Sequence, residues 1–141
     1  EFSRRARGFT VWAALRHLGR GGVADLVERC CSHARRFADR LATPGRVEIL
    51  NEVVLNQVLV RFTPVSAGSG GSGAPGGDAA ARDEYTREVI RRVQADGTCW
   101  LSGTTWRGQA AMRISVSNWS TTEADVDRSA AAIRRAAELP D

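Results

Sequence analysis

Arg113 is the residue whose type and position in this sequence best fit a binding role. Around it, Met112, Ile114 and Val116 alternate with small or polar residues, a period of two that is typical of a β-strand with one apolar face. Arg113 falls on the opposite face. Its guanidinium is always charged and can donate two parallel hydrogen bonds to a carboxylate. The pattern leaves two interpretations open, a surface ion pair or a site that binds a carboxylate ligand.

The sequence contains few other residues in patterns that indicate catalysis or metal binding. All 20 basic residues are arginine, and a chain without lysine cannot form a Schiff base with a carbonyl cofactor. The three cysteines (Cys30, Cys31 and Cys99) lack the spacing of metal ligands, and we interpret them as small buried residues in a reducing compartment. His17 and His33 stand apart from any Ser, Cys or carboxylate cluster and are expected to be structural or exposed. We therefore expect no metal site.

Composition narrows the classes of partner. The chain of 141 residues has a net charge of +4, but its arginines are scattered among acidic residues and no nucleic-acid-binding motif is present. No apolar run is long enough to cross a membrane. We thus expect neither a nucleic-acid nor a membrane partner. The chain begins at Glu1 and its one methionine is Met112, so we expect a piece of a longer protein.

The first half of the sequence predicts two helices and two strands. A short helix over Phe9–Leu18 should end at a group of glycines, and a long amphipathic helix should cover Val23–Leu41. Strands are predicted over Arg46–Leu50 and Gln57–Phe62. Residues 64–82 are rich in glycine and serine and are expected to form a flexible loop.

The second half predicts a helix, a hairpin and a last helix. The helix covers Asp83–Ala95, and the strands Thr98–Thr105 and Gln109–Ser117 are joined through residues 106–108. A helix over Thr121–Leu139 follows, with Ser120 and Glu123 at the spacing of a capping box. Strand pairs that alternate with helices predict an α+β fold, with helices packed on a small, mostly antiparallel sheet.

Four segments together resemble the C-terminal part of the pyridoxal-phosphate (PLP)-dependent decarboxylases, the group that contains the aromatic-L-amino-acid, tyrosine, histidine and glutamate decarboxylases. The first two, SRRARGFTVWAALRHLG and LVERCCSHARRFADRL, resemble the segment after the cofactor lysine and the long helix that follows it. The other two, VEILNEVVLNQVLVRF and DGTCWLSGTTWRGQAAMRISVSNWSTTEADVD, resemble the first strands and the closing hairpin and helix of the small domain.

The resemblance implies a fold-type I architecture. Residues 1–45 would be the tail of the large PLP domain with its connecting helix, and residues 46–141 the C-terminal small domain. The cofactor lysine and the other residues that hold PLP would lie upstream of residue 1. This placement agrees with the absence of lysine.

The resemblance also assigns roles to residues. MRISV matches a strand on which fold-type I enzymes commonly hold the substrate α-carboxylate, so Arg113 is the expected substrate-binding residue. Ser3 and Arg4 match a turn near the active site of the other subunit. The expected whole protein is a cytoplasmic, homodimeric amino-acid decarboxylase, of which this segment alone is inactive. Another fold-type I reaction, such as transamination or aldol cleavage, and a non-catalytic interaction module stay as alternatives.

Overall fold

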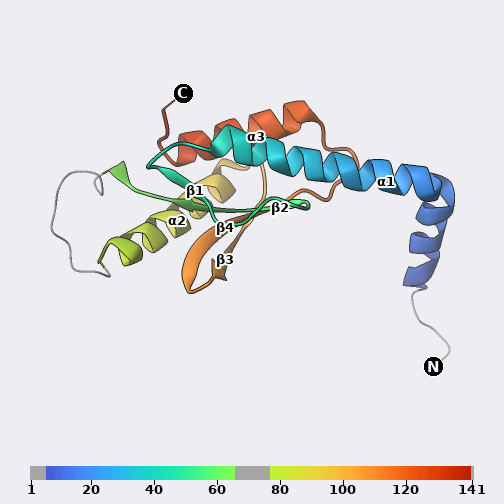
Figure 1. Cartoon of the computed structure of the whole chain (residues 1–141), viewed down its shortest axis with the longest axis horizontal. Coiled ribbons are helices and arrows are strands. Elements are labelled where there is room, and N and C mark those ends of the chain that lie inside the picture. Colours follow the sequence, from blue (N-terminus) through green and yellow to red (C-terminus); the bar gives the residue numbers. More distant parts are fainter. Residues whose placement is uncertain (1–5, 66–76, 141) are drawn as a thin grey trace.

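The computed structural model describes residues 6–65 and 77–140 of the chain. Its elements are, in order, α1 (Arg7–Leu41), β1 (Val47–Ile49), β2 (Gln57–Phe62), α2 (Gly77–Asp96), β3 (Ser102–Trp106), β4 (Gln109–Ser115) and α3 (Glu123–Ala136). The strands form one antiparallel sheet in the order β1-β2-β4-β3 (Figure 1). The predicted α+β fold is confirmed.

Helix α1 consists of two helical parts that meet at Gly19. This residue has φ 63° and ψ −176°, a combination that is almost restricted to glycine. The kink confirms the two predicted helices, although the first begins at Arg7 and the second takes in the residues just after Gly19. Figure 1 shows the first part turned away from the rest of the protein.

One face of the sheet forms the core together with all three helices. Val58 and Val60 of β2 and Met112 of β4 are fully buried on this face, and Ile114 is nearly so. The helices contribute apolar residues to the same cluster, among them Phe37, Leu41, Val89, Val93, Val126 and Ile133. The second part of α1 therefore shares a core with the residues after 45. The domain boundary near residue 45 stays a prediction.

Helix α2 begins six residues earlier than predicted, because residues 77–82, which we expected in the loop, form its first turns. Ala79–Ala81 are strong helix formers, and the Ala79 carbonyl accepts a hydrogen bond of 3.0 Å from Arg61 Nη2. The expected flexibility of residues 66–76 lies outside the described residues. The glycine-rich stretch ends at Gly77, and the alanines that follow it favour a helix and not a loop.

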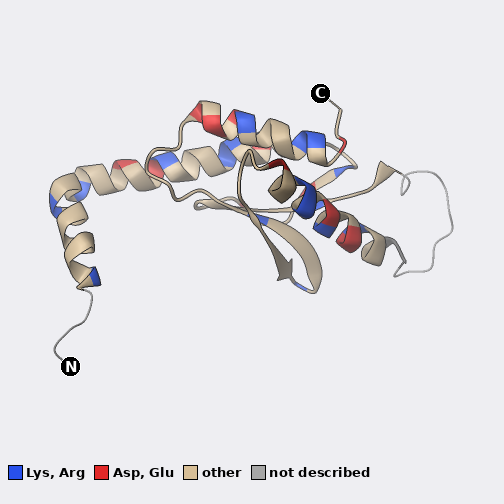
Figure 2. Ribbon diagram, turned by 180° about the vertical axis from the view of Figure 1, so that it is seen from behind, with Lys and Arg blue, Asp and Glu red and all other residues tan. Residues whose placement is uncertain are grey.

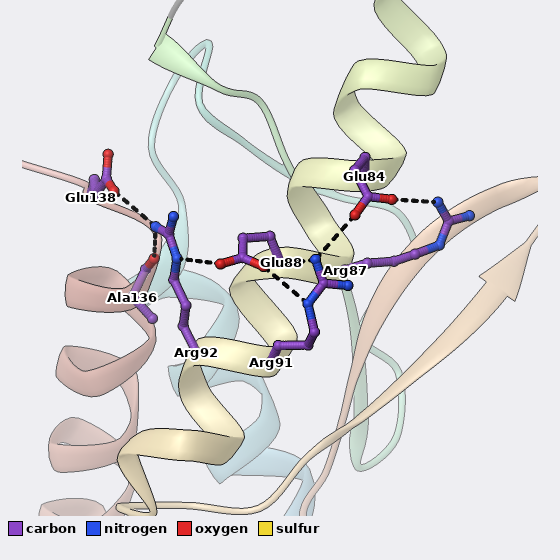
Figure 3. Close-up of polar contacts among 7 residues, drawn as sticks. All are labelled: Glu84, Arg87, Glu88, Arg91, Arg92, Ala136 and Glu138. Atoms are coloured by element: carbon purple, nitrogen blue, oxygen red, sulfur yellow. Dashed lines mark hydrogen bonds and ion pairs between the residues drawn. The ribbon is translucent and has the colours of Figure 1, made fainter.

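Charged residues gather on the helices, while the strands carry few (Figure 2). On α2, Glu84 and Glu88 pair with Arg87, Arg91 and Arg92. Figure 3 shows how Arg92 also reaches the end of α3, where it donates to the Ala136 carbonyl at 3.2 Å and pairs with Glu138. Among the described helices, none is long and apolar enough to cross a membrane.

The capping box of α3 is formed by Thr122 and Asp125, so the predicted pair of Ser120 and Glu123 was wrong. Thr122 is extended (φ −107°, ψ 167°) and its Oγ1 accepts from the Asp125 amide, while the Asp125 carboxylate accepts from the Thr122 amide at 2.9 Å. Ser120 lies two residues before the N-cap, where its amide and hydroxyl both donate to Asn118 Oδ1. The helix consequently begins two residues later than predicted.

Candidate carboxylate-binding site

Strand β4 holds Arg113 in the middle of the sheet, on the face opposite the core. In the register, Arg113 lies across from Leu59 on β2 and from Ser102 on β3. Since side chains alternate along a strand, the burial of Met112 and Ile114 among the helices turns Arg113 to the other side. Its side chain is exposed there, as the sequence predicted.

Among the described residues, the charge of Arg113 has no counter-ion. Strands β2, β3 and β4 contain no Asp or Glu, and within the described residues no carboxylate lies at ion-pair distance from Arg113. The other arginine of these three strands, Arg61, is in the opposite situation. It is 2 % exposed, and its Nη2 lies 2.6 Å from Asp83 Oδ1. The surface ion pair considered for Arg113 is therefore not seen in the described part of the chain.

Ser102 makes the polar contact of the Arg113 guanidinium. Arg113 Nη2 donates to Ser102 Oγ across 3.3 Å, from the middle of β4 to the edge strand β3. A hydroxyl is neutral, so this contact orients the guanidinium without cancelling its charge. An oriented, exposed guanidinium on strands β2, β3 and β4, which hold no acidic residue, is suited to bind a carboxylate.

The other two predicted site residues are not placed. Ser3 and Arg4 lie outside the described residues, so their expected position near the other subunit's active site stays a prediction. The described ranges also contain no group of three or more His, Cys, Asp or Glu side chains that could hold a metal ion.

A cavity of about 490 Å³ lies near the end of β4, against α3. Ile114, Val126 and Ile133 line its apolar part, and Cys99 and Ser129 lie on its wall. Burial raises the pKa of the Cys99 thiol, and the hydrogen bond with Ser129 opposes that shift only in part. A thiol with a raised pKa is a poorer nucleophile at neutral pH than an ordinary cysteine, so this environment does not favour a nucleophilic role for Cys99.

His33 has a structural role. It is buried on α1, and its Nε2 lies 3.0 Å from the Thr121 carbonyl oxygen. The contact joins α1 to the segment that enters α3. The described residues place no nucleophile or carboxylate in hydrogen-bond contact with the ring, which agrees with the structural interpretation of this histidine from the sequence.

Sequence reasoning missed Ser102 and the buried Arg61–Asp83 pair. The signal for Ser102 in the sequence was Gly108, because glycine favours the positive φ of a two-residue hairpin turn. In the structure Arg107 and Gly108 both have positive φ (49° and 80°). Counting back from such a turn, with Trp106 opposite Gln109, places Ser102 opposite Arg113. The Arg61–Asp83 pair had no comparable signal, because it depends on where α2 packs.

Comparison with known proteins finds similar plant enzymes, two named as decarboxylases and one as an aldehyde synthase. No family model matches the chain. The chain is 29% identical over 113 residues to tryptophan decarboxylase 1 of Oryza sativa subsp. japonica. The matched region covers 80% of this chain and 21% of the relative. This sequence thus spans about a fifth of that relative's length.

Solved structures agree with the sequence comparison. The crystal structure of Oryza sativa TDC with PLP and tryptamine matches with a TM-score of 0.79 and 23% identity, over 96% of this chain and 27% of the other. Rhodiola rosea 4-hydroxyphenylacetaldehyde synthase matches with a TM-score of 0.74 and 27% identity, over the same shares. In sequence and in fold, the chain is therefore similar to the C-terminal part of the PLP-dependent decarboxylases, with plant aromatic-amino-acid decarboxylases among its relatives.

Proposed function

We propose that this chain is the C-terminal part of a PLP-dependent amino-acid decarboxylase, in which Arg113 binds the substrate's α-carboxylate. The observation that carries the proposal is the exposed Arg113 guanidinium on β4, which, like its two neighbouring strands β2 and β3, holds no acidic residue. A solvated arginine on such a face can accept a carboxylate ligand without first breaking an ion pair.

The residues of this chain do not fit a PLP site of their own. PLP in this class of enzyme is held by a lysine, and the sequence has none. The cofactor would therefore be bound by residues outside this sequence, and the part played by this chain is to position the substrate. On its own the chain is expected to be inactive.

The proposed partners are the enzyme's own large domain and a second, identical subunit. The first part of α1 supports this, because its large apolar residues are exposed: Phe9, Val11, Trp12 and Leu15 each expose half or more of their surface. An apolar helix that packs on nothing within the described residues suits an interface. Ser3 and Arg4 are proposed to border the active site of the other subunit. The proposed location is the cytoplasm.

A different PLP reaction is the second candidate. One structural neighbour is named an aldehyde synthase, and its TM-score of 0.74 is close to the 0.79 of the Oryza sativa structure. The residues that would decide between the reactions are not in this sequence. Arg113 would have the same role in either case, since both reactions use an amino acid with an α-carboxylate.

Product analysis tests the reaction class. The full-length protein, loaded with PLP, would be incubated separately with L-tyrosine, L-tryptophan, L-histidine and L-glutamate. We expect one of them to give carbon dioxide and the corresponding amine in equal amounts. Formation of an aldehyde or an oxo acid without the amine would favour the second candidate. Absence of any turnover by the PLP-loaded protein would favour a non-catalytic module. The 141-residue chain alone is the negative control.

A further inference from the structure

We propose that Ser102 is the second hydrogen-bonding residue of the Arg113 site. Its hydroxyl would accept a hydrogen bond from Arg113 Nη2 and donate its own proton to the carboxylate that Arg113 binds. The inference deepens the proposed function and rests on it. Three features of the structure support it: the position of Ser102 in the register, the bonding capacity of its hydroxyl, and the absence of acidic residues from the surrounding strands.

The register fixes the two side chains side by side. Ser102 on β3 and Arg113 on β4 are direct cross-strand partners, so their side chains project from the same face of the sheet. The contact of 3.3 Å between Nη2 and Oγ results from this pairing. Because Ser102 begins β3 and is paired in register with Arg113, the backbone holds the hydroxyl and the guanidinium together before a ligand arrives.

The hydroxyl has an unused donor. A serine hydroxyl can accept two hydrogen bonds and donate one. Ser102 Oγ accepts from Arg113, and the described residues offer it no other hydrogen-bond partner. Its proton can therefore turn to a carboxylate oxygen that is bound beside the guanidinium. A hydrogen bond to a charged acceptor is stronger than one between neutral groups.

The side chain at position 102 also determines whether the charge of Arg113 is free to bind a ligand. A carboxylate at this position would lie opposite Arg113 at cross-strand distance and would form an ion pair with it. Serine orients the guanidinium and leaves its charge for the ligand. Ser102→Asp should therefore close the site, whereas Ser102→Thr, which keeps a hydroxyl on the same atom, should leave it open.

The test compares variants of the full-length, PLP-loaded protein. Two kinetic constants would be measured: KM for the L-amino acid that the parent decarboxylates fastest, and the inhibition constant of the matching amine, which lacks the carboxylate. Ser102→Ala, Ser102→Thr and Ser102→Asp are the informative variants. The control is Ser115→Ala, which changes an exposed serine on the face of β4 that carries Arg113.

We expect Ser102→Ala to raise KM about 5- to 15-fold and to leave kcat within about twofold, because the lost hydrogen bond acts on substrate binding. Ser102→Thr should stay within about twofold of the parent, and Ser102→Asp should raise KM more than Ser102→Ala does. The inhibition constant of the amine should not change in Ser102→Ala, because the amine lacks the carboxylate that Ser102 is proposed to bind. A structural defect would instead weaken the binding of both ligands.

Arg113→Lys in the same series separates this inference from the proposed function. If Arg113→Lys weakens the amino acid and Ser102→Ala does not, Ser102 has no part in the site and the inference is overturned alone. Equal weakening of the amino acid and the amine by Ser102→Ala would overturn it too. If neither substitution affects the amino acid, the proposed role of Arg113 fails, and the inference fails with it.

Discussion

Arg61 of β2 and Asp83 of α2 form a buried ion pair, in which Nη2 and Oδ1 lie 2.6 Å apart. Only 3% of the Arg61 side chain is exposed, against 19% of Asp83. The same Asp83 oxygen accepts a hydrogen bond of 3.1 Å from the Ala110 amide. One carboxylate thus joins α2 to two strands of the sheet, beyond the last pair of the β2–β4 ladder, Val60 with Met112.

Removing that carboxylate should be costly. Asp83→Ala leaves Arg61 charged and buried without its partner, and we expect the free energy of unfolding to fall by about 3–5 kcal/mol. Glu84→Ala is the matched control on the same helix, because the ion pairs of Glu84 are exposed and should contribute less than about 1 kcal/mol. Urea unfolding followed by tryptophan fluorescence measures both. Similar effects from the two substitutions would contradict the structural role of Asp83.

Acid should weaken the contact between α1 and α3 through Asp127. Its pKa is lowered, first by the hydrogen bond from Arg36 and then by that from Arg40, despite an opposing effect of burial. A lowered pKa means that the folded state favours the carboxylate. The stabilisation is therefore fully present above the ordinary pKa of 3.8 and is lost as the pH falls through the lower, folded-state value.

The measurement is the free energy of unfolding between pH 6 and pH 2.5. Asp127→Asn should lower stability at pH 6 and should flatten the decline at acid pH. The control is Asp39→Asn, which changes an exposed residue on α1 with no ion pair in the described part of the chain. A decline as steep in Asp127→Asn as in the parent would show that Asp127 does not contribute to it.

The exposed apolar stripe of α1 should cause the isolated 141-residue chain to self-associate. The stripe consists of Phe9, Trp12 and Leu15, and the rings of Phe9 and Trp12 are stacked with centroids 6.1 Å apart. Replacing all three by serine should give a monomer in sedimentation velocity. Val54→Ser with Leu55→Ser, which changes two exposed apolar residues of the β1–β2 connection, should leave association intact. A compact parent monomer with cooperative unfolding would refute this prediction.

The isolated chain should not bind PLP covalently, because it offers no lysine side chain. After incubation with PLP and reduction with borohydride, mass spectrometry of internal peptides should find no pyridoxyl group on any side chain. Lysine introduced at an exposed position, for example Arg87→Lys, is the positive control for the detection method. A pyridoxyl group on a side chain of the unaltered sequence would contradict the proposal that the cofactor is held elsewhere.

Much of the fold could be predicted because its periodic patterns are strong. Strand β2, for example, lies at its predicted bounds, Gln57–Phe62. Local competition was harder to foresee. Thr122 rather than Ser120 caps α3, and Ser120 instead donates from its amide and hydroxyl to the side chain of Asn118.

The candidate site was predictable only in part. The alternation around Arg113 fixed its face of the sheet, but its neighbour Ser102 depended on the hairpin register, which the sequence had left as a three-residue connection. Arg61 shows more clearly what the sequence alone does not reveal. An arginine in an apolar strand gives no sign of whether it is solvated or buried, and the answer came from a helix more than 20 residues later in the chain.

The most direct test of the proposed role of Arg113 is kcat/KM for decarboxylation by the full-length Arg113→Lys variant. Lysine keeps the charge but loses the planar, two-pronged geometry, so we predict a fall of about 30- to 1000-fold, or about 2–4 kcal/mol. PLP content and stability should not change. Arg87→Lys, which alters an exposed arginine paired with Glu84, is the control and should match the parent. If kcat/KM of Arg113→Lys stays within about threefold of the parent, Arg113 does not bind the substrate carboxylate.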